Sequence, residues 1–375
     1  MVYAVVCSYQ FTEHVVSAPQ FSDQKQNSSY RLSFRPYSRQ LVAPLKMSRG
    51  VIDRREGVIV RIEDDDGAGE SYGEAVTLPY FGTETVDEAC RLLAGLETVS
   101  FAALEEIPKH YFATRLAIES ALLLRSPGVL SDPALSNRTM SVSKLLPSGV
   151  AAVEVLRKGL SEGFETFKWK VGIESAESEI AVLKKLFGEL KSNNKLRLDA
   201  NGGLSFARAA SLLEFCEGTQ VEFIEQPIAP DKLEESMELA ARWSTPIALD
   251  ESVATMDDIE RVYRAGWRGL YVVKPSRLGE LRAFLQWREA SRCSIVYSSA
   301  LETAVGTEMG LRVAASDPIN SFSLGYGVAH WFFEDGLSLH LNSPRVCANN
   351  LPGKGFGEMW RLLKQRPHSG ARQSP

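Results

Sequence analysis

The interpretation of the whole chain starts from one stretch, Thr166-Phe167-Lys168-Trp169-Lys170-Val171-Gly172. Its aromatic and β-branched residues predict a strand. Because side chains alternate across a strand, Lys168 and Lys170 point from the same face. Two adjacent ammonium groups against a packed interior are unfavourable unless negative groups lie opposite them. The remainder of the sequence should therefore supply carboxylates that meet this strand.

Carboxylates do follow at regular intervals, each directly after a short apolar run. The series consists of Asp199, Glu225 and Asp250, and it continues with Lys274 and Ser299. Counted from Lys170, the steps of 24 to 29 residues are typical of successive strand-helix units. In a (β/α)8 barrel the carboxyl ends of the strands meet at one face, where active sites lie. Any one of these residues alone is equally well explained as a solvated loop charge, but the ordered series favours a barrel with one shared pocket.

The length of the chain indicates a second domain. A TIM-type barrel takes roughly 250 residues, which leaves about 125 of the 375. We therefore expect an α/β protein, a (β/α)8 barrel with an N-terminal α+β capping domain. The expected divisions are an extension at 1–28, the capping domain at 29–135, the barrel at 136–340, and a C-terminal segment at 341–375 that packs back on the capping domain. Whether the extension is poorly ordered or forms an added strand is left open.

Local patterns place the elements of the capping domain. Alternating residues predict antiparallel strands at 30–35, 57–63 and 68–75. The acidic turn between the last two is interpreted as a solvated hairpin tip. Thr85, with Glu88 three residues on, forms a capping box that predicts a helix to Glu97, and a second helix is expected at 108–124.

Strands and helices then alternate through the barrel. The first two strands are expected at 141–146 and 164–171, the seventh at 293–299, and a weaker eighth at 321–325. Amphipathic periodicity predicts an outer ring of helices. These helices are expected at 177–191, 205–216, 232–243, 256–265, 280–290 and 302–315.

Composition excludes several classes of protein. With 44% hydrophobic and 24% charged residues and a net charge of −5, the chain resembles an ordinary soluble globular protein. It has no basic block for nucleic acid and no apolar run long enough for a membrane. Five scattered cysteines without CxxC spacing predict reduced thiols in the cytoplasm, although an organellar origin is left open. A homo-oligomer is also left open.

The charged series predicts metal-assisted acid-base chemistry on a small carboxylate. Three carboxylates with no His or Cys in their motifs form an all-oxygen site, which favours Mg²⁺, with Mn²⁺ as a substitute. A substrate carboxylate on the metal would place its α-carbon between Lys170 and Lys274. Lys168 and the metal would lower the pKa of Lys170, which makes that lysine a usable base near neutrality.

At the level of whole motifs, the chain resembles the muconate-lactonising subgroup of the enolase superfamily. The motifs are the KxK strand, Asp-Ala-Asn, Glu-Gln-Pro, Asp-Glu-Ser and Lys-Pro-Ser-Arg-Leu-Gly, and the resemblance spans residues 30–360. It implies a capping domain that closes over the barrel mouth. It also implies residue roles: Asp199, Glu225 and Asp250 as Mg²⁺ ligands, and Lys170 and Lys274 as the acid/base pair.

Within that subgroup the residues around Asp199 and Ser299 are most similar to those of o-succinylbenzoate synthases. That resemblance implies Mg²⁺-dependent syn-dehydration of 2-succinyl-6-hydroxy-2,4-cyclohexadiene-1-carboxylate in menaquinone or phylloquinone biosynthesis. It also implies a serine contact to the succinyl carboxylate. The expected substrate contacts are Lys168, Arg197, Asn201 and Ser299.

Two alternatives use the same residues. An N-succinylamino acid racemase or a dipeptide epimerase would employ Lys170 and Lys274 as two bases. Dipeptide epimerases carry an Asp-x-Asp after the eighth strand to hold an ammonium group, and residues 324–330 here contain no acid. A barrel retained only for binding would have no reason to keep both lysines and all three carboxylates.

Overall fold

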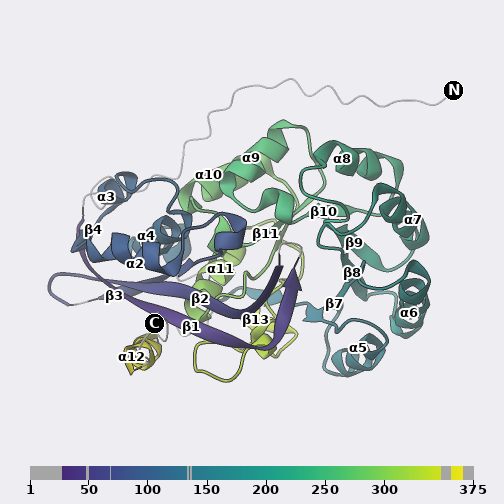
Figure 1. Cartoon of the computed structure of the whole chain (residues 1–375), viewed down its shortest axis with the longest axis horizontal. Coiled ribbons are helices and arrows are strands. Elements are labelled where there is room, and N and C mark those ends of the chain that lie inside the picture. The colour runs from purple at the N-terminus through teal and green to yellow at the C-terminus, as the bar shows by residue number, and fades with distance from the viewer. Residues whose placement is uncertain are drawn as a thin grey trace, which may run out of the picture.

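The computed structural model describes residues 28–47, 50–67, 69–132, 135, 137–347 and 356–365. An antiparallel sheet with its helices lies beside a parallel sheet that is surrounded by helices (Figure 1). This is a mixed α/β fold with an N-terminal antiparallel cap. The expected extension at 1–28 falls almost entirely outside the described residues.

The cap is a four-stranded antiparallel sheet in the order β3-β2-β1-β4. Its strands are β1 (Tyr30–Met47), β2 (Gly50–Glu63), β3 (Glu70–Val76) and β4 (Thr98–Val99). Its helices are α2 (Val86–Ala94), α3 (Phe101–Glu105) and α4 (Phe112–Arg125). The first two strands are longer than predicted and form one hairpin, in which Arg31 pairs with Glu63. The predicted capping box is confirmed, because Thr85 and Glu88 exchange side-chain and backbone hydrogen bonds at the start of α2.

The second sheet has seven parallel strands, and their spatial order follows the sequence. They are β6 (Lys144–Leu145), β7 (Thr166–Lys170), β8 (Lys195–Asp199), β9 (Val221–Glu225), β10 (Ile247–Leu249), β11 (Leu270–Val273) and β12 (Ile295–Tyr297). Parallel neighbours require crossover connections, which helices supply. All the strand ends that bear predicted site residues therefore lie at one edge of one sheet.

The helices of this region pack around the sheet (Figure 1). They are α5 (Ala151–Ser161), α6 (Ala176–Glu189), α7 (Phe206–Cys216), α8 (Leu233–Arg242), α9 (Met256–Arg264), α10 (Leu281–Ser291) and α11 (Ala304–Ser316). Six of them match the predicted ranges to within two residues at each end. The helix at 151–161, between the first two barrel strands, was not predicted.

The two predicted edge strands of the barrel differ from expectation. In the range 141–146 only β6 joins the parallel sheet, while β5 (Thr139–Ser141) pairs with β13 (Arg345–Cys347). The predicted eighth strand is reduced to two isolated bridges, Val142 to Leu324 and Ser298 to Gly325. Leu324 and Gly325 therefore contact both edges of the sheet without forming a regular strand between them.

The C-terminal helix α12 (Phe356–Gln365) packs against the cap. Phe356 and Trp360 make edge contacts to the ring of Tyr72, and the Arg35 guanidinium lies 4.1 Å from the Trp360 ring centroid. Aromatic and cation-π contacts of this kind add to the burial of apolar area. Among the described residues, every helix is too short or too polar to cross a bilayer.

Candidate active site

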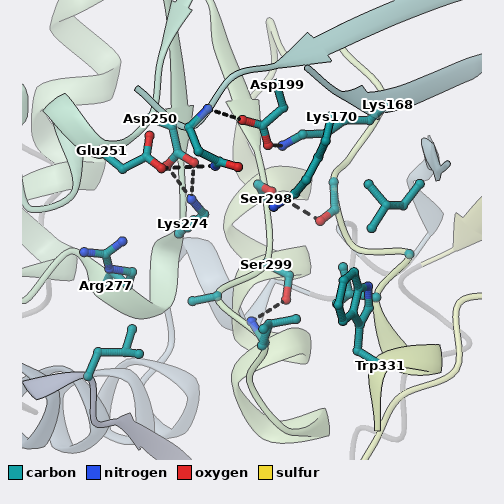
Figure 2. A pocket seen from close by; sticks show the side chains of 18 of the residues that line it. Lys168, Lys170, Asp199, Asp250, Glu251, Lys274, Arg277, Ser298, Ser299 and Trp331 are labelled. Atoms are coloured by element: carbon teal, nitrogen blue, oxygen red, sulfur yellow. Dashed lines mark hydrogen bonds and ion pairs between the residues drawn. The ribbon is translucent and has the colours of Figure 1, made fainter. Parts of the chain in front are cut away.

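A cavity of about 190 Å³ opens between the cap and the carboxyl ends of the parallel strands. Both parts of the molecule line it, the cap through Ile52, Arg55, Leu78 and Phe81. The predicted site residues in its wall are Lys168, Lys170, Asp199, Asn201, Asp250, Lys274 and Ser299. Figure 2 labels all of these except Asn201 and shows the labelled side chains converging from separate strand ends. The sequence spacing therefore does bring most of the predicted site residues into one pocket.

Two of the lysines are held by carboxylates. The Lys168 ammonium lies 2.8 Å from Asp199 Oδ2 and 2.6 Å from Glu225 Oε1, so it bridges the ends of β8 and β9. The Lys274 ammonium forms an ion pair with both oxygens of Asp250. The first contact is diagonal, because Lys168 and Lys170 on β7 pair with Arg197 and Asp199 on β8, so Lys168 reaches one same-face position further along β8.

The third lysine has no such partner. Among the described residues, Lys170 makes no hydrogen bond or ion pair through its ammonium group, and it points into the cavity (Figure 2). An amine without a carboxylate partner has no ion pair to break before it exchanges a proton. Lys170 is thus the lysine best placed to act as a base.

Burial and charge shift the pKa values of the carboxylates in opposite directions. Burial and the nearby Asp199 raise the pKa of Glu225 to about 8. Burial alone would raise the pKa of Asp250, but the ammonium groups of Lys274 and Lys168 hold it below its usual value. Burial also opposes the charged form of Lys168, yet the carboxylates of Asp199 and Glu225 outweigh this and raise its pKa. Three buried carboxyl groups thus share two lysines, and the raised pKa of Glu225 reflects this shortage of positive partners.

Gln226, which follows Glu225, fixes the position of Asp250. It is fully buried, and its Oε1 accepts hydrogen bonds from the backbone N–H groups of Asp250 at 3.0 Å and Ser252 at 3.1 Å. Its Nε2 donates to the Ser252 hydroxyl and to the carbonyl of Ile228. With φ of 37°, Gln226 lies in the left-handed region that non-glycine residues seldom adopt. All four contacts fix the conformation in which β10 presents Asp250.

Asn201 supports the neighbouring strand end. Its backbone N–H donates to Asp199 Oδ1 at 3.0 Å, and its side-chain amide donates to Glu251 Oε1 at 3.2 Å. Its φ of 43° again lies in the left-handed region. Burial and the adjacent Asp250 raise the pKa of Glu251 to about 7.

Arg197 was expected to contact the substrate, and the structure corrects this expectation. It does not line the cavity; its Nε donates to Glu222 at 2.7 Å and its Nη1 to the carbonyl of Ser323 at 2.7 Å. The spacing of two residues places Arg197 on the same face of β8 as Asp199, but about 6.6 Å deeper along the strand. There it forms an interior ion pair and does not reach the position expected for substrate.

Several cavity residues were not singled out by sequence reasoning. Arg55, Arg277 and Trp331 all line the wall, and Gln226 lies behind it. Arg277 and Gln226 were inside quoted motifs but received no role, because nothing in a motif shows where a side chain ends. Arg55 comes from the middle of a cap strand, which carries no local signal for a distant cavity.

The residues present fit a divalent cation by their chemistry. Asp199, Glu225 and Asp250 are buried oxygen donors on three adjacent strands, the ligands that hard cations prefer. In the described residues no three acidic, His or Cys side chains are spaced to hold a metal ion. Lys168 and Lys274 contact the same oxygens that a metal ion would use, so binding of a divalent cation requires these ammonium groups to move aside.

Fold and site together define an enzyme of the enolase class. Residues 151–352 match the family described as Enolase C-terminal domain-like. The chain belongs to this family, and the predicted resemblance is confirmed.

Two o-succinylbenzoate synthases are similar to most of the chain. The o-succinylbenzoate synthase of Thermosynechococcus vestitus is 34% identical over 310 residues, which covers 80% of this chain and 93% of the relative. The crystal structure of o-succinylbenzoate synthase from Thermosynechococcus elongatus BP-1, with Mg in its active site, superimposes with a TM-score of 0.75. The two chains are 30% identical over 90% of this chain and all of the other.

A relative with a different reaction also matches. The L-Ala-D/L-amino acid epimerase of Populus trichocarpa is 26% identical over 369 residues, covering 91% of this chain and 84% of the relative. The two reactions therefore occur on related chains, so the choice between them depends on the residues that line the cavity.

Proposed function

We propose that the chain is a Mg²⁺-dependent o-succinylbenzoate synthase. It removes water from 2-succinyl-6-hydroxy-2,4-cyclohexadiene-1-carboxylate and releases the aromatic product 2-succinylbenzoate. The observation that carries this proposal is the cavity itself, where an unpaired Lys170 and the charged Lys274 lie beside three buried carboxylates. The similarity to o-succinylbenzoate synthase over most of the chain supports the choice of substrate.

Asp199, Glu225 and Asp250 would hold the Mg²⁺, with Mn²⁺ as a substitute. When bound, the metal stabilises negative charge that develops on the substrate carboxylate. Asn201 and Gln226 keep two of these ligands in position through the hydrogen bonds described above. Lys168 remains charged and balances Asp199 and Glu225.

In the proposed reaction Lys170 removes the proton from the ring carbon that bears the carboxylate. The double bond forms toward the neighbouring carbon as its bond to the hydroxyl oxygen breaks. Lys170 then returns the proton to the departing hydroxyl, which leaves as water. Lys274 stays protonated on the other strand end and stabilises the charge that builds up on the carboxylate.

A closed (β/α)8 barrel belongs to the same proposal. The bridges from Leu324 and Gly325 to both edges of the sheet support closure at the position of the eighth strand. The domain divisions at 29–135, 136–340 and 341–375 also remain proposals.

The alternative is a racemase or epimerase that uses Lys170 and Lys274 as two bases. The similarity to the Populus enzyme favours it. The wall near Gly325, Gly327 and Val328 carries no acidic side chain for a substrate ammonium. This lack counts against a dipeptide, although it leaves an N-succinylamino acid possible.

The test is a spectrophotometric assay of the purified protein with the cyclohexadiene substrate, first with Mg²⁺ and then with EDTA. We expect metal-dependent growth of aromatic absorbance. If no product forms, proton exchange into an N-succinylamino acid in D₂O, followed by NMR, identifies the racemase.

The metal ligands have a separate test. Asp250→Asn should lower Mg²⁺ affinity at least tenfold in titration calorimetry, because an amide is a poorer ligand than a carboxylate. Asp257→Asn, on the exposed start of α9, is the matched control. Unchanged affinity in Asp250→Asn would remove Asp250 from the ligand set.

A further inference from the structure

The side chains that line the cavity carry more positive than negative charge. Five cations line it: Arg55, Lys168, Lys170, Lys274 and Arg277. Three carboxylates line it: Asp199, Asp250 and Glu251. A divalent cation would add further positive charge. A cavity of this charge favours a ligand with two negative groups over a ligand with one.

Arg277 accounts for part of this excess. It ends the short η5 turn (Pro275–Arg277), three residues after Lys274, and its guanidinium lies 4.8 Å from the ring centroid of Phe81 in the cap. Within the described part of the chain its guanidinium makes no hydrogen bond and no ion pair. Arg55 differs, because two backbone carbonyls, those of Thr77 and Ala300, accept its hydrogen bonds.

Three other buried arginines are each paired with a carboxylate, whereas the buried Arg55 is met by backbone carbonyls. Arg39 pairs with Asp335, Arg197 with Glu222, and Arg288 with Asp317. A guanidinium has five N–H donors and is stable away from water only when acceptors meet them. Arg277 is half-buried and lines the cavity, so a ligand bound there can meet the N–H donors that the described residues leave without an acceptor.

Asp250 and Glu251 both lie close enough to Arg277 to act on its charge. Asp250 is already paired with Lys274, which leaves Glu251 as the competitor in the cavity wall. Its Oε2 is buried without a partner, and it lies close enough to Arg277 to affect the pKa of the arginine. The two groups nevertheless form no ion pair, and Glu251 Oε1 is occupied by the amide of Asn201. Figure 2 shows Glu251 on the side of Asp250, with Arg277 lower in the view, apart from it.

We propose that Arg277 binds the second carboxylate of the substrate, the one at the end of the succinyl chain. This inference rests on the proposed function. The ring carboxylate lies at the lysine and acidic end of the cavity, and the succinyl chain extends toward the cap. Stacking on Phe81 holds the guanidinium plane, so that it can present two parallel N–H groups to a carboxylate.

Ser299 is compatible with the same contact but does not replace it. Its hydroxyl oxygen accepts a hydrogen bond from the backbone of Leu301 at 2.9 Å. A hydroxyl carries no charge and offers one donor, whereas a guanidinium neutralises the carboxylate. Arg277 is therefore the residue that discriminates between an acid and a neutral group at the end of the chain.

The experiment compares two ligands on the Mg²⁺-loaded protein. One is the product, 2-succinylbenzoate, and the other is 2-butanoylbenzoate, in which a methyl group replaces the remote carboxylate. Titration calorimetry should show that the wild-type protein binds the product roughly 10- to 100-fold more tightly. Arg277→Met should bind both ligands about equally, and Arg277→Lys should recover part of the preference.

Two further variants isolate the effect. Arg264→Met removes an exposed arginine of α9 that pairs with Glu260, and it should keep the full preference. Phe81→Leu removes the stacking ring and should reduce the preference without altering charge. If Arg277→Met does not fold, as judged by its thermal melt, the same comparison of the two ligands is made with Arg277→Lys and Phe81→Leu.

The outcomes separate this inference from the proposed function. If wild-type protein neither forms nor binds 2-succinylbenzoate, the proposed function fails and the inference fails with it. If wild type does both and Arg277→Met keeps the preference, the inference alone is overturned. Equal loss of affinity for both ligands also overturns it, because Arg277 would then act on Lys274 or Glu251 instead.

Discussion

Lys170 differs from the other two lysines of the cavity in having no carboxylate beside it among the described residues. Lys168 and Lys274 are each held within ion-pair distance of an acid. A catalytic base has to lose its proton during each cycle, so the unpaired amine is the suitable one. Three lysines of one wall therefore divide into two that are held and one that can exchange protons.

Lys170→Ala should abolish turnover, with a loss of at least about 10³-fold, because the base is removed. The thermal melt and Mg²⁺ affinity should stay close to those of the wild type. The assay is aromatic product formation. Lys184→Ala, exposed on α6, serves as the control and should retain full activity. Turnover near the wild-type rate in Lys170→Ala would assign the base to another residue.

Gln226→Met should be costly although the two side chains are similar in size. Two buried backbone N–H groups, those of Asp250 and Ser252, would lose their acceptor. An unsatisfied buried donor costs about 1 to 3 kcal/mol, so we expect the free energy of unfolding to fall by about 2 to 4 kcal/mol. Urea denaturation measures this, and Mg²⁺ affinity should fall as well.

Exposed Gln286 on α10 provides the matched change, and Gln286→Met should leave both quantities unaltered. A stable Gln226→Met protein with normal Mg²⁺ binding would show that Asp250 is held without the amide.

At the scale of elements, the close contact between α4 and β3 determines the packing of the cap. The backbone of β3 lies so near the helix that a Cβ on Gly73 would stand 1.8 Å from the carbonyl oxygen of Ala117. Glycine is needed here because the partner is backbone and cannot rotate away. This contact lets β3 carry Glu74 to the start of α11, where its carboxylate accepts a hydrogen bond from the Thr303 backbone at 3.0 Å.

Gly73→Ala should therefore destabilise the protein by about 1 to 3 kcal/mol through overpacking. Gly188→Ala, in α6, is the matched control because nothing lies within 4 Å of the added methyl group. That control should be neutral or stabilising by up to about 1 kcal/mol. Guanidinium denaturation of both variants gives the comparison, and equal stabilities would contradict the close contact between α4 and β3.

At the scale of the whole molecule, the cap and the parallel-sheet region meet at two buried carboxyl groups. Glu74 lies on β3 of the cap, and Glu302 follows β12 of the parallel sheet. Burial and the nearby Glu74 raise the pKa of Glu302 to about 7. A carboxyl group with a raised pKa in the folded chain favours folding while it is protonated. Its contribution is fully present below about pH 4.5 and is lost as the pH rises through about 7.

Glu302→Gln, neutral at every pH, should lose less stability than the wild type between pH 4.5 and 7. Urea denaturation across this interval measures the difference. Exposed Glu289→Gln should behave like the wild type. If the wild-type slope persists in Glu302→Gln, the pH dependence comes from another group.

The sequence by itself determined the parallel sheet and brought most of the predicted site residues to one edge of it. Strand alternation and the order of strand ends are local properties, so the period of about 25 residues placed Lys170, Asp199, Asp250 and Lys274 at one edge without any knowledge of packing. The helices between them followed from amphipathic periodicity. The edges were predicted less well, because whether 141–146 and 321–325 pair regularly depends on neighbours distant in sequence.

Only the tertiary structure decided which side chains reach the cavity and which are paired. Arg197 and Asp199 share one face of one strand, yet depth along that strand separates an interior ion pair from a cavity residue. Lys168 and Lys170 also share a face, yet carboxylates from other strands hold only the first. Arg277 lacks an acceptor because of what surrounds it in the cap and the barrel. These differences depend on partners from several strands and from a second sheet, and no local pattern contains them.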